Sequence, residues 1–167
     1  AELETAEGRY IWRARDFAKL VQAADIQPED EILDIAPGTG YSTAILSQLA
    51  GAVVGLESDE ALAEQASKRL DDLNVENADI VAGDLKAGLA AQGPFDVIFV
   101  NGTVEAFPDA WVDQLKDGGR LAIVMRDGRS SHACIYTKSN GVVCEANAFD
   151  AAPPALPGFE KAEAFEF

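Results

Sequence analysis

A glycine-rich turn between a short apolar segment and a helical pattern constrains the fold of this chain more than any other feature. Residues 31–35 have the length and apolar content of a buried strand, and a Pro-Gly-Thr-Gly turn follows before Tyr41. Glycine accepts positive φ angles and lets a ligand approach the backbone closely, so Gly38 and Gly40 suit a tight strand-to-helix turn. The unit predicts a parallel α/β sheet that binds a ligand at the carboxyl ends of its strands.

The rest of the chain repeats this alternation, which predicts a doubly wound, mostly parallel sheet of the Rossmann-like type in one domain covering residues 1–167. The expected helices are 13–24, 41–49, 60–73 and 108–115, and the expected strands are 31–35, 53–57, 78–82, 95–100 and 120–125. Asn140-Gly141 between two apolar runs, 133–138 and 142–149, predicts a C-terminal antiparallel hairpin. The alternation of Phe165 and Phe167 with Glu166 suits a final edge strand within 159–167.

Composition excludes several classes of partner. The chain has 29 acidic and 13 basic residues, a net charge of −16, and such a surface repels nucleic-acid phosphates. No apolar run approaches the roughly 20 residues of a membrane helix, and the first residues lack the apolar core of a signal peptide. Cys134 and Cys144 are expected to be reduced, and neither has metal-ligand spacing. We therefore expect a cytoplasmic monomer or weak homodimer without a metal, a membrane or nucleic acid.

Polar residues follow the predicted strands in the order that a nucleoside cofactor requires. Glu57 ends the second strand, where a carboxylate can accept both ribose hydroxyls. Asp84 follows the third strand, where it can accept from an adenine amino group while Leu85 packs near the ring. Asn101 follows the fourth strand and would line the reaction centre. The candidate cofactor-binding residues are Asp34, Ala36, Gly38, Gly40, Tyr41, Glu57, Ser58, Asp84, Leu85 and Asn101.

Two cofactor classes compete for this site. A dinucleotide prefers Gly-x-Gly-x-x-Gly, but Thr43 stands at the third glycine position, and a pyrophosphate would be repelled by Asp34. S-adenosylmethionine carries an ammonium and a sulfonium group and no phosphate, so an acidic residue suits it. The sequence favours S-adenosylmethionine.

Five motifs follow one another in order between about Ala14 and Pro154: Asp34 to Tyr41, Val54 to Glu57, Gly83-Asp84, Phe95 to Ile98 and Gln114 to Leu121. Together they resemble the protein-L-isoaspartate O-methyltransferase family of class I methyltransferases. The resemblance implies methyl transfer from S-adenosylmethionine to the carboxylate of L-isoaspartyl residues in damaged proteins. A carboxylate is already ionised at neutral pH, so the reaction requires no general base and no catalytic residue is assigned.

Two positions depart from the family pattern. Ala36 stands where the family usually has glycine, and the Thr-Ile-Ser-x-Pro stretch that helps the family bind its substrate is absent near Tyr10 to Ala14. Candidate substrate residues in this segment are Thr5, Arg9, Tyr10 and Trp12, with Arg13 and Arg15 as further cations for an acceptor carboxylate. Two alternatives remain open: a methyltransferase of the same fold with a different acceptor, and a non-catalytic S-adenosylmethionine-binding module.

Overall fold

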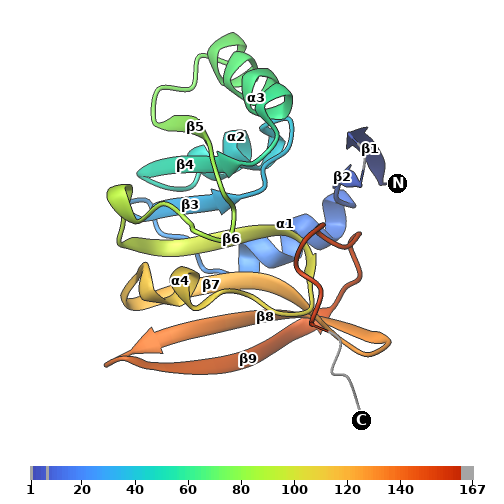
Figure 1. Cartoon of the computed structure of the whole chain (residues 1–167). Coiled ribbons are helices and arrows are strands. Elements are labelled where there is room, and N and C mark those ends of the chain that lie inside the picture. The colour runs from blue at the N-terminus through green and yellow to red at the C-terminus, as the bar shows by residue number, and fades with distance from the viewer. Residues whose placement is uncertain (1, 7, 163–167) are drawn as a thin grey trace.

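A seven-stranded sheet with strand order β5-β4-β3-β6-β7-β8-β9 forms the centre of the protein (Figure 1). The structure is a computed structural model that describes residues 2–6 and 8–162. The parallel strands are β3 (Glu31–Ile35), β4 (Ala52–Glu57), β5 (Ala78–Ala82), β6 (Phe95–Val104) and β7 (Leu115–Asp127), and the antiparallel ones are β8 (Ser130–Ser139) and β9 (Val142–Asp150). The doubly wound sheet and its C-terminal antiparallel hairpin are confirmed.

The strand order reverses at β3, which pairs with β4 on one side and with β6 on the other. Asp34 lies opposite Gly55 of β4 and opposite Phe99 of β6. Connections leave such a reversal point in opposite directions, so a crevice opens above the carboxyl end of β3. The glycine-rich turn lies at this point.

Three helices cover one face of the sheet: α1 (Ala14–Ala23), α2 (Tyr41–Ser47) and α3 (Glu60–Asp72). They bury Leu20, Leu46 and Leu70 against the strand residues that point to the same face. The opposite face is covered by η1 (Ala90–Gln92), α4 (Asp109–Asp113) and the C-terminal segment. In Figure 1 α1 passes behind β6 while α4 lies in front of the sheet.

An N-terminal hairpin precedes the first helix and was not predicted from the sequence. It consists of β1 (Leu3–Ala6) and β2 (Arg9–Ile11), which pair antiparallel in a separate two-stranded sheet. Strands this short carry too few residues to show a period-2 pattern. The hairpin lies at the side of the sheet where β3 and β4 end (Figure 1).

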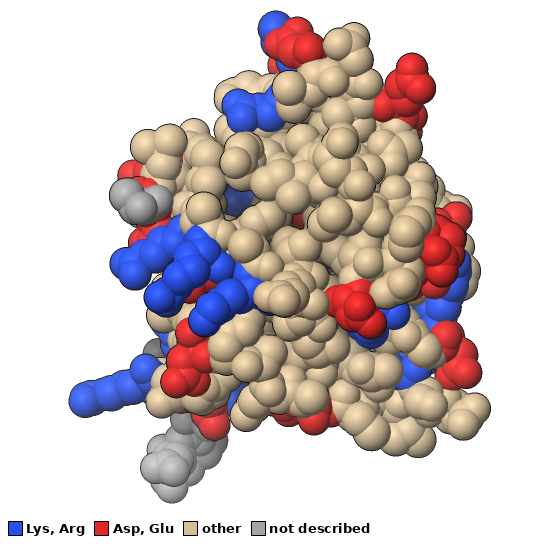
Figure 2. Space-filling view, turned by 180° about the vertical axis from the view of Figure 1, so that it is seen from behind, with Lys and Arg blue, Asp and Glu red and all other residues tan. Residues whose placement is uncertain are grey.

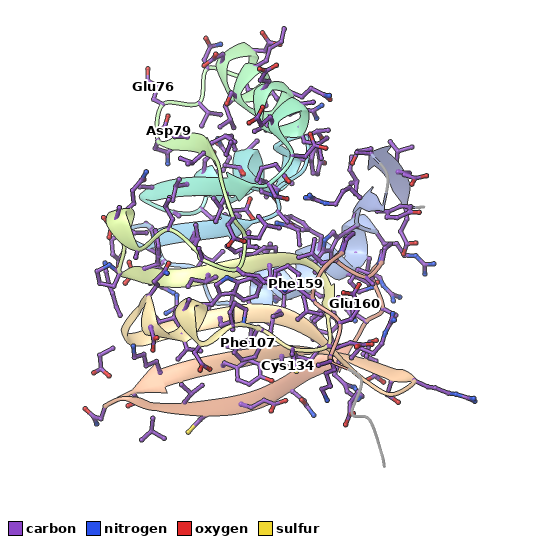
Figure 3. The ribbon with its side chains drawn as sticks, in the orientation of Figure 1. Glu76, Asp79, Phe107, Cys134, Phe159 and Glu160 are labelled. Carbon is purple, nitrogen blue, oxygen red and sulfur yellow. The ribbon has the colours of Figure 1, made fainter. Side chains whose placement is uncertain are left out.

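The C-terminal segment crosses back over the end of β6 instead of extending the sheet. Thr103 donates from Oγ1 to the Pro153 carbonyl at 2.5 Å, and Leu156 N donates to the Thr103 carbonyl at 2.8 Å. Phe159 then packs on Trp111, with ring centroids 5.2 Å apart, on the front of the molecule (Figure 3). Residues 159–162 form no strand, contrary to expectation, and Phe165 and Phe167 lie outside the described residues.

Other expectations concern single residues. Cys134 is buried, Cys144 is exposed, and both are free thiols that face Asn147 and Thr137 across the β8–β9 hairpin. Among residues 2–6 and 8–162, no helix is long and apolar enough to span a membrane. The same residues contain no group of three or more His, Cys, Asp or Glu side chains that could hold a metal ion.

Candidate cofactor-binding site

A cavity of about 520 Å³ opens between the glycine-rich turn, α1, α2 and the N-terminal hairpin. It joins predicted cofactor residues to predicted substrate residues across a large sequence separation. Those on its wall are Ala36, Gly38, Tyr41, Asn101, Thr5, Tyr10 and Trp12. Seven predicted residues therefore share one cavity, whereas the other candidates are not among the residues that line it: Arg9, Asp34, Gly40, Glu57, Ser58, Asp84 and Leu85.

The turn itself has three residues in the left-handed region: Ala36, Gly38 and Gly40, with φ of 59°, 60° and 86°. At Gly40 a Cβ atom would lie 2.9 Å from Ala66 Cα, so glycine is required for α2 to begin this close to α3. At Gly38 the nearest atom to a Cβ would be Thr5 Oγ1 at 4.0 Å, so this residue faces open space. The positive φ of Ala36 explains why glycine suits that position.

Asp34 lies beneath the turn and is fully buried. Its Oδ2 accepts hydrogen bonds from Ser42 Oγ at 2.6 Å and Thr43 Oγ1 at 2.7 Å, and its Oδ1 accepts from Asn101 Nδ2 at 2.7 Å. Burial raises the pKa of Asp34 from 3.8 to about 6; the nearby Glu57 charge adds to this rise, and the three hydrogen bonds oppose it. Asp34 thus ties β3 to α2 and β6, and its contact with a cofactor ammonium stays a prediction.

Glu57 ends β4 with no exposed side-chain surface and receives five N–H donors. Arg9 forms a bidentate ion pair with it, Nη1 to Oε1 and Nη2 to Oε2, both at 2.6 Å. Gly38 N donates to Oε2 at 2.8 Å, while Ser58 N and Asp59 N donate to Oε1 at 2.9 and 3.2 Å. The predicted ribose carboxylate is therefore buried beside the glycine-rich turn and paired with a predicted substrate residue.

The predicted adenine residues do not lie on the cavity wall. Asp84 is exposed, and its Oδ1 accepts from Lys86 N at 3.0 Å. The Leu85 side chain is buried in the core on the α4 face, and its carbonyl accepts from Trp111 Nε1 at 2.8 Å. Gly83 N donates to the Glu57 carbonyl, so the loop that carries Asp84 begins beside the end of β4.

The N-terminal candidates differ in how free their side chains are. Thr5 Oγ1 donates to the Arg9 carbonyl at 3.3 Å, and Tyr10 is 39% exposed. Trp12 is buried, with its ring 6.2 Å from those of both Phe17 and Phe99. Its Nε1 has no hydrogen-bond partner among the described residues. Trp12 and Asn101 both line the cavity.

Basic side chains gather beside the cavity although the whole chain is acidic. Arg13 and Arg15 have exposed side chains and contact Glu2 at 3.4 Å and Asp16 at 3.2 Å. Figure 2 shows Lys and Arg side chains clustered on the side of the molecule that carries the N-terminal segment, next to a hollow in the surface. This side attracts an anionic acceptor more than the rest of the surface does.

Sequence reasoning missed three parts of the site. Ser42 and Thr43 hold Asp34, and the signal was present as two hydroxyl residues in the first turn of a helix. Phe17, Val21 and Ile45 line the cavity, although their helical spacing indicated only that they face the core. The Arg9–Glu57 pair joins residues 48 positions apart, which no local pattern in the sequence indicates.

A family model and the similar curated proteins point to the same family. The model of the protein-L-isoaspartate(D-aspartate) O-methyltransferase family matches residues 2–151. The protein-L-isoaspartate O-methyltransferase of Koribacter versatilis is 42% identical over 116 residues, which are 70% of this chain and 52% of that protein. The curated relatives are longer than this chain, which spans about half to two thirds of their length.

Solved structures agree on the fold. A protein-L-isoaspartate O-methyltransferase structure superposes with a TM-score of 0.82 at 26% identity, covering 89% of this chain and 49% of that one. A Plasmodium falciparum protein described as a beta-aspartate methyltransferase in complex with S-adenosyl-L-homocysteine superposes with a TM-score of 0.76. That protein is 21% identical, with 93% of this chain and 79% of that one covered, and it supports the fold alone.

Proposed function

The chain belongs to the protein-L-isoaspartate(D-aspartate) O-methyltransferase family, and we propose that it transfers the methyl group of S-adenosylmethionine to the carboxylate of an L-isoaspartyl residue. The observation that carries this proposal is the buried Glu57 beside the glycine-rich turn, at the switch point of the sheet. The Glu57 carboxylate would accept the hydrogen bonds of the ribose hydroxyls of S-adenosylmethionine.

The residues present fit this cofactor. Both oxygens of Glu57 accept the paired N–H donors of Arg9, and the same two positions would accept two ribose hydroxyls in place of Arg9. The cavity beside Gly38 has room for the methionine part, and Asn101 is part of its wall. Asp84, at the start of the loop next to Glu57, would accept from the adenine amino group after a side-chain rotation, since it is exposed.

The chemistry asks for positioning more than for proton transfer. When bound, S-adenosylmethionine supplies a methyl group carried on a positively charged sulfur, which an ionised carboxylate oxygen accepts without a base. The protein's part is to orient the acceptor and exclude water, and such positioning can contribute up to about 7–11 kcal/mol. Apolar side chains on the cavity wall, among them Trp12, Phe17 and Ile45, suit the exclusion of water.

The acceptor would be held by the N-terminal segment. Arg13 and Arg15 are exposed beside the cavity, where a guanidinium can hold a peptide carboxylate in a charge-assisted hydrogen bond. Tyr10 lines the same cavity and can donate a hydrogen bond from its hydroxyl, whereas Thr5 Oγ1, which donates to the Arg9 carbonyl, can accept one. Partners would accordingly be proteins or peptides with isoaspartyl residues.

A second candidate function is a methyltransferase of the same fold with a different acceptor. It is favoured by one observation: buried Trp12 lies in the segment where the family carries its serine and proline, and the neighbouring cavity wall is largely apolar. Such a wall suits an acceptor with an apolar body.

The decisive experiment measures transfer of labelled methyl groups to an isoaspartyl peptide, with the aspartyl peptide of the same sequence as control. We expect label only in the isoaspartyl peptide. Intact binding of S-adenosylhomocysteine without transfer would rule out the isoaspartyl acceptor and leave a different acceptor or a non-catalytic S-adenosylmethionine-binding module. No binding of S-adenosylhomocysteine would contradict both.

The ribose assignment is tested by Glu57→Gln, with Glu60→Gln in the first turn of α3 as the matched control. The first variant should weaken S-adenosylhomocysteine binding by about tenfold or more, because a neutral amide accepts hydroxyl donors less strongly than a carboxylate. The second variant should bind as the unchanged protein does. Calorimetric titration measures both in a protein that also carries Arg9→Met, because Arg9 occupies both oxygens of Glu57. Equal affinities with and without Glu57→Gln in that protein would refute the role of Glu57.

A further inference from the structure

The two oxygens of Glu57 have no capacity left for a ribose in this structure. A carboxylate offers about four lone-pair positions. Two backbone donors, Ser58 N and Asp59 N, share Oε1 with Arg9 Nη1, and Gly38 N shares Oε2 with Arg9 Nη2. A pair of hydroxyl groups can approach only if two of these donors leave. The three backbone donors belong to the sheet end and the turn, so Arg9 is the group that can move.

The Arg9 guanidinium presents the same pattern of donors as a ribose. Its two terminal N–H groups lie side by side and reach the two oxygens of one carboxylate, as the two neighbouring hydroxyls of a ribose do. If the two ribose hydroxyls replaced the two terminal N–H groups of Arg9, Glu57 would exchange two hydrogen-bond donors for two others. Its contacts with the three backbone N–H groups would stay unchanged. The Arg9 side chain is 11% exposed, so it fills this position rather than passing over it.

The segment that carries Arg9 is weakly attached to the sheet. β1 and β2 form a sheet of their own and share no ladder with the seven strands. Within the described part of the chain, Arg9 makes the only side-chain or backbone hydrogen bonds from residues 2–11 to the rest, and Glu2 adds one ion contact to Arg13. An isolated two-stranded hairpin has marginal stability in water, so this one can shift as a unit.

We propose that Arg9 is an internal mimic of the cofactor ribose: it holds Glu57 when no cofactor is bound, and S-adenosylmethionine binds by displacing it together with the N-terminal hairpin. This inference rests on the proposed function, because it requires that Glu57 bind a ribose. Binding of the cofactor then carries the cost of opening the ion pair. Since Thr5 lies in β1 and Tyr10 in β2, the same displacement rearranges the cavity wall that they form.

The affinity of S-adenosylhomocysteine tests the proposal directly. Where only a minor fraction of molecules has Arg9 away from Glu57, the apparent dissociation constant is raised by the inverse of that fraction. Arg9→Met keeps the apolar stem and removes the donors, so it should bind S-adenosylhomocysteine about tenfold more tightly or better. Arg9→Lys keeps the positive charge but lacks the paired N–H donors, so its affinity for S-adenosylhomocysteine should lie between those of Arg9→Met and the unchanged protein. The control Arg129→Met removes one charge from the exposed β7–β8 turn and should leave the affinity unchanged.

Trypsin gives a second readout without any variant. It cleaves after arginine, and the bond after Arg9 is protected while the guanidinium is held by Glu57. Saturating S-adenosylhomocysteine should accelerate cleavage after Arg9 at least severalfold, with cleavage after Arg129 as the internal standard. Slower cleavage after Arg9, or an Arg9→Met variant that binds no more tightly than the unchanged protein, would overturn the proposal. Failure of the unchanged protein and all variants to bind would instead overturn the proposed function.

Discussion

Two buried aspartates, Asp30 just before β3 and Asp34 within β3, have different surroundings. Asp30 precedes β3 and accepts from Arg120 Nη2 at 2.6 Å, so its charge is balanced by a guanidinium. Asp34 receives only neutral donors from Ser42, Thr43 and Asn101. A buried charge without a counter-ion costs free energy, and the raised pKa of Asp34 expresses that cost.

We therefore expect Asp34→Asn to stabilise the fold at pH 7, by on the order of 2 kcal/mol. The folded protein holds the Asp34 proton up to about pH 6, whereas the unfolded chain loses it near 3.8. The free energy of unfolding of the unchanged protein consequently falls as pH rises from about 4 to about 6. The gain from Asp34→Asn should be near zero at pH 4 and complete at pH 7.

Urea denaturation at both pH values measures this gain, and Asp30→Asn is the matched control. The control removes a charge that Arg120 balances, so it should destabilise the fold at pH 7. If Asp34→Asn lowers the free energy of unfolding at pH 7, the hydrogen bonds to the Asp34 carboxylate stabilise the fold by more than the burial of its charge destabilises it.

At the scale of the elements, the start of α2 is limited by its distance from α3. Gly40→Ala would place a methyl group 2.9 Å from the Ala66 backbone, and the helices would have to separate. We expect this variant to lose more than about 2 kcal/mol of stability, from overpacking together with the positive φ. Gly38→Ala has a similar positive φ but open space, so its loss should be about 1 kcal/mol.

Thermal denaturation of the two variants separates these effects, because both introduce the same methyl group two residues apart. Equal losses would indicate that backbone conformation, and not the contact with Ala66, decides the cost. Gly38→Ala has a further use, since its methyl group would enter the cavity and should also weaken S-adenosylhomocysteine binding.

The elements with a clear hydrophobic period were predictable from the sequence. α1 was expected at 13–24 and spans Ala14–Ala23, and β5 was expected and found at 78–82. The β1–β2 hairpin was missed because three or four residues carry too little pattern. β7 begins at Leu115, before the Gly118-Gly119 pair that was expected to precede it, since pairing of Phe95 with Leu115 extends the strand.

The site divides in the same way. Residues at the ends of predicted strands, such as Gly38 and Asn101, could be placed because parallel topology brings strand ends together. The inward direction of Leu85 could not, because it depends on Trp111 binding the Leu85 carbonyl from an element 26 residues later. The pairing of Arg9 with Glu57 likewise depends on tertiary geometry.

At the scale of the whole molecule, the excess of acidic residues should make stability depend on salt. With 29 acidic and 13 basic residues, repulsion between like charges destabilises the compact state, and salt screens it. Raising sodium chloride from 10 to 300 mM should raise the melting temperature by a few degrees, at about 2–4 °C for each kcal/mol. A fall in melting temperature in differential scanning calorimetry would show that ion pairs such as Arg120–Asp30 outweigh the repulsion.

The strand order has a consequence for how the chain reaches this structure. The sheet from β7 to β9 is a meander whose strands are joined by short turns, so its contacts are local in sequence. The pairing of β3 with β6 instead joins positions such as Ile32 and Val97, 65 residues apart. Contacts between distant residues carry a larger loop-closure entropy and form more slowly. The meander of β7 to β9 can therefore assemble early, and the pairing of β6 with β3, which brings the glycine-rich turn to the centre of the sheet, comes later.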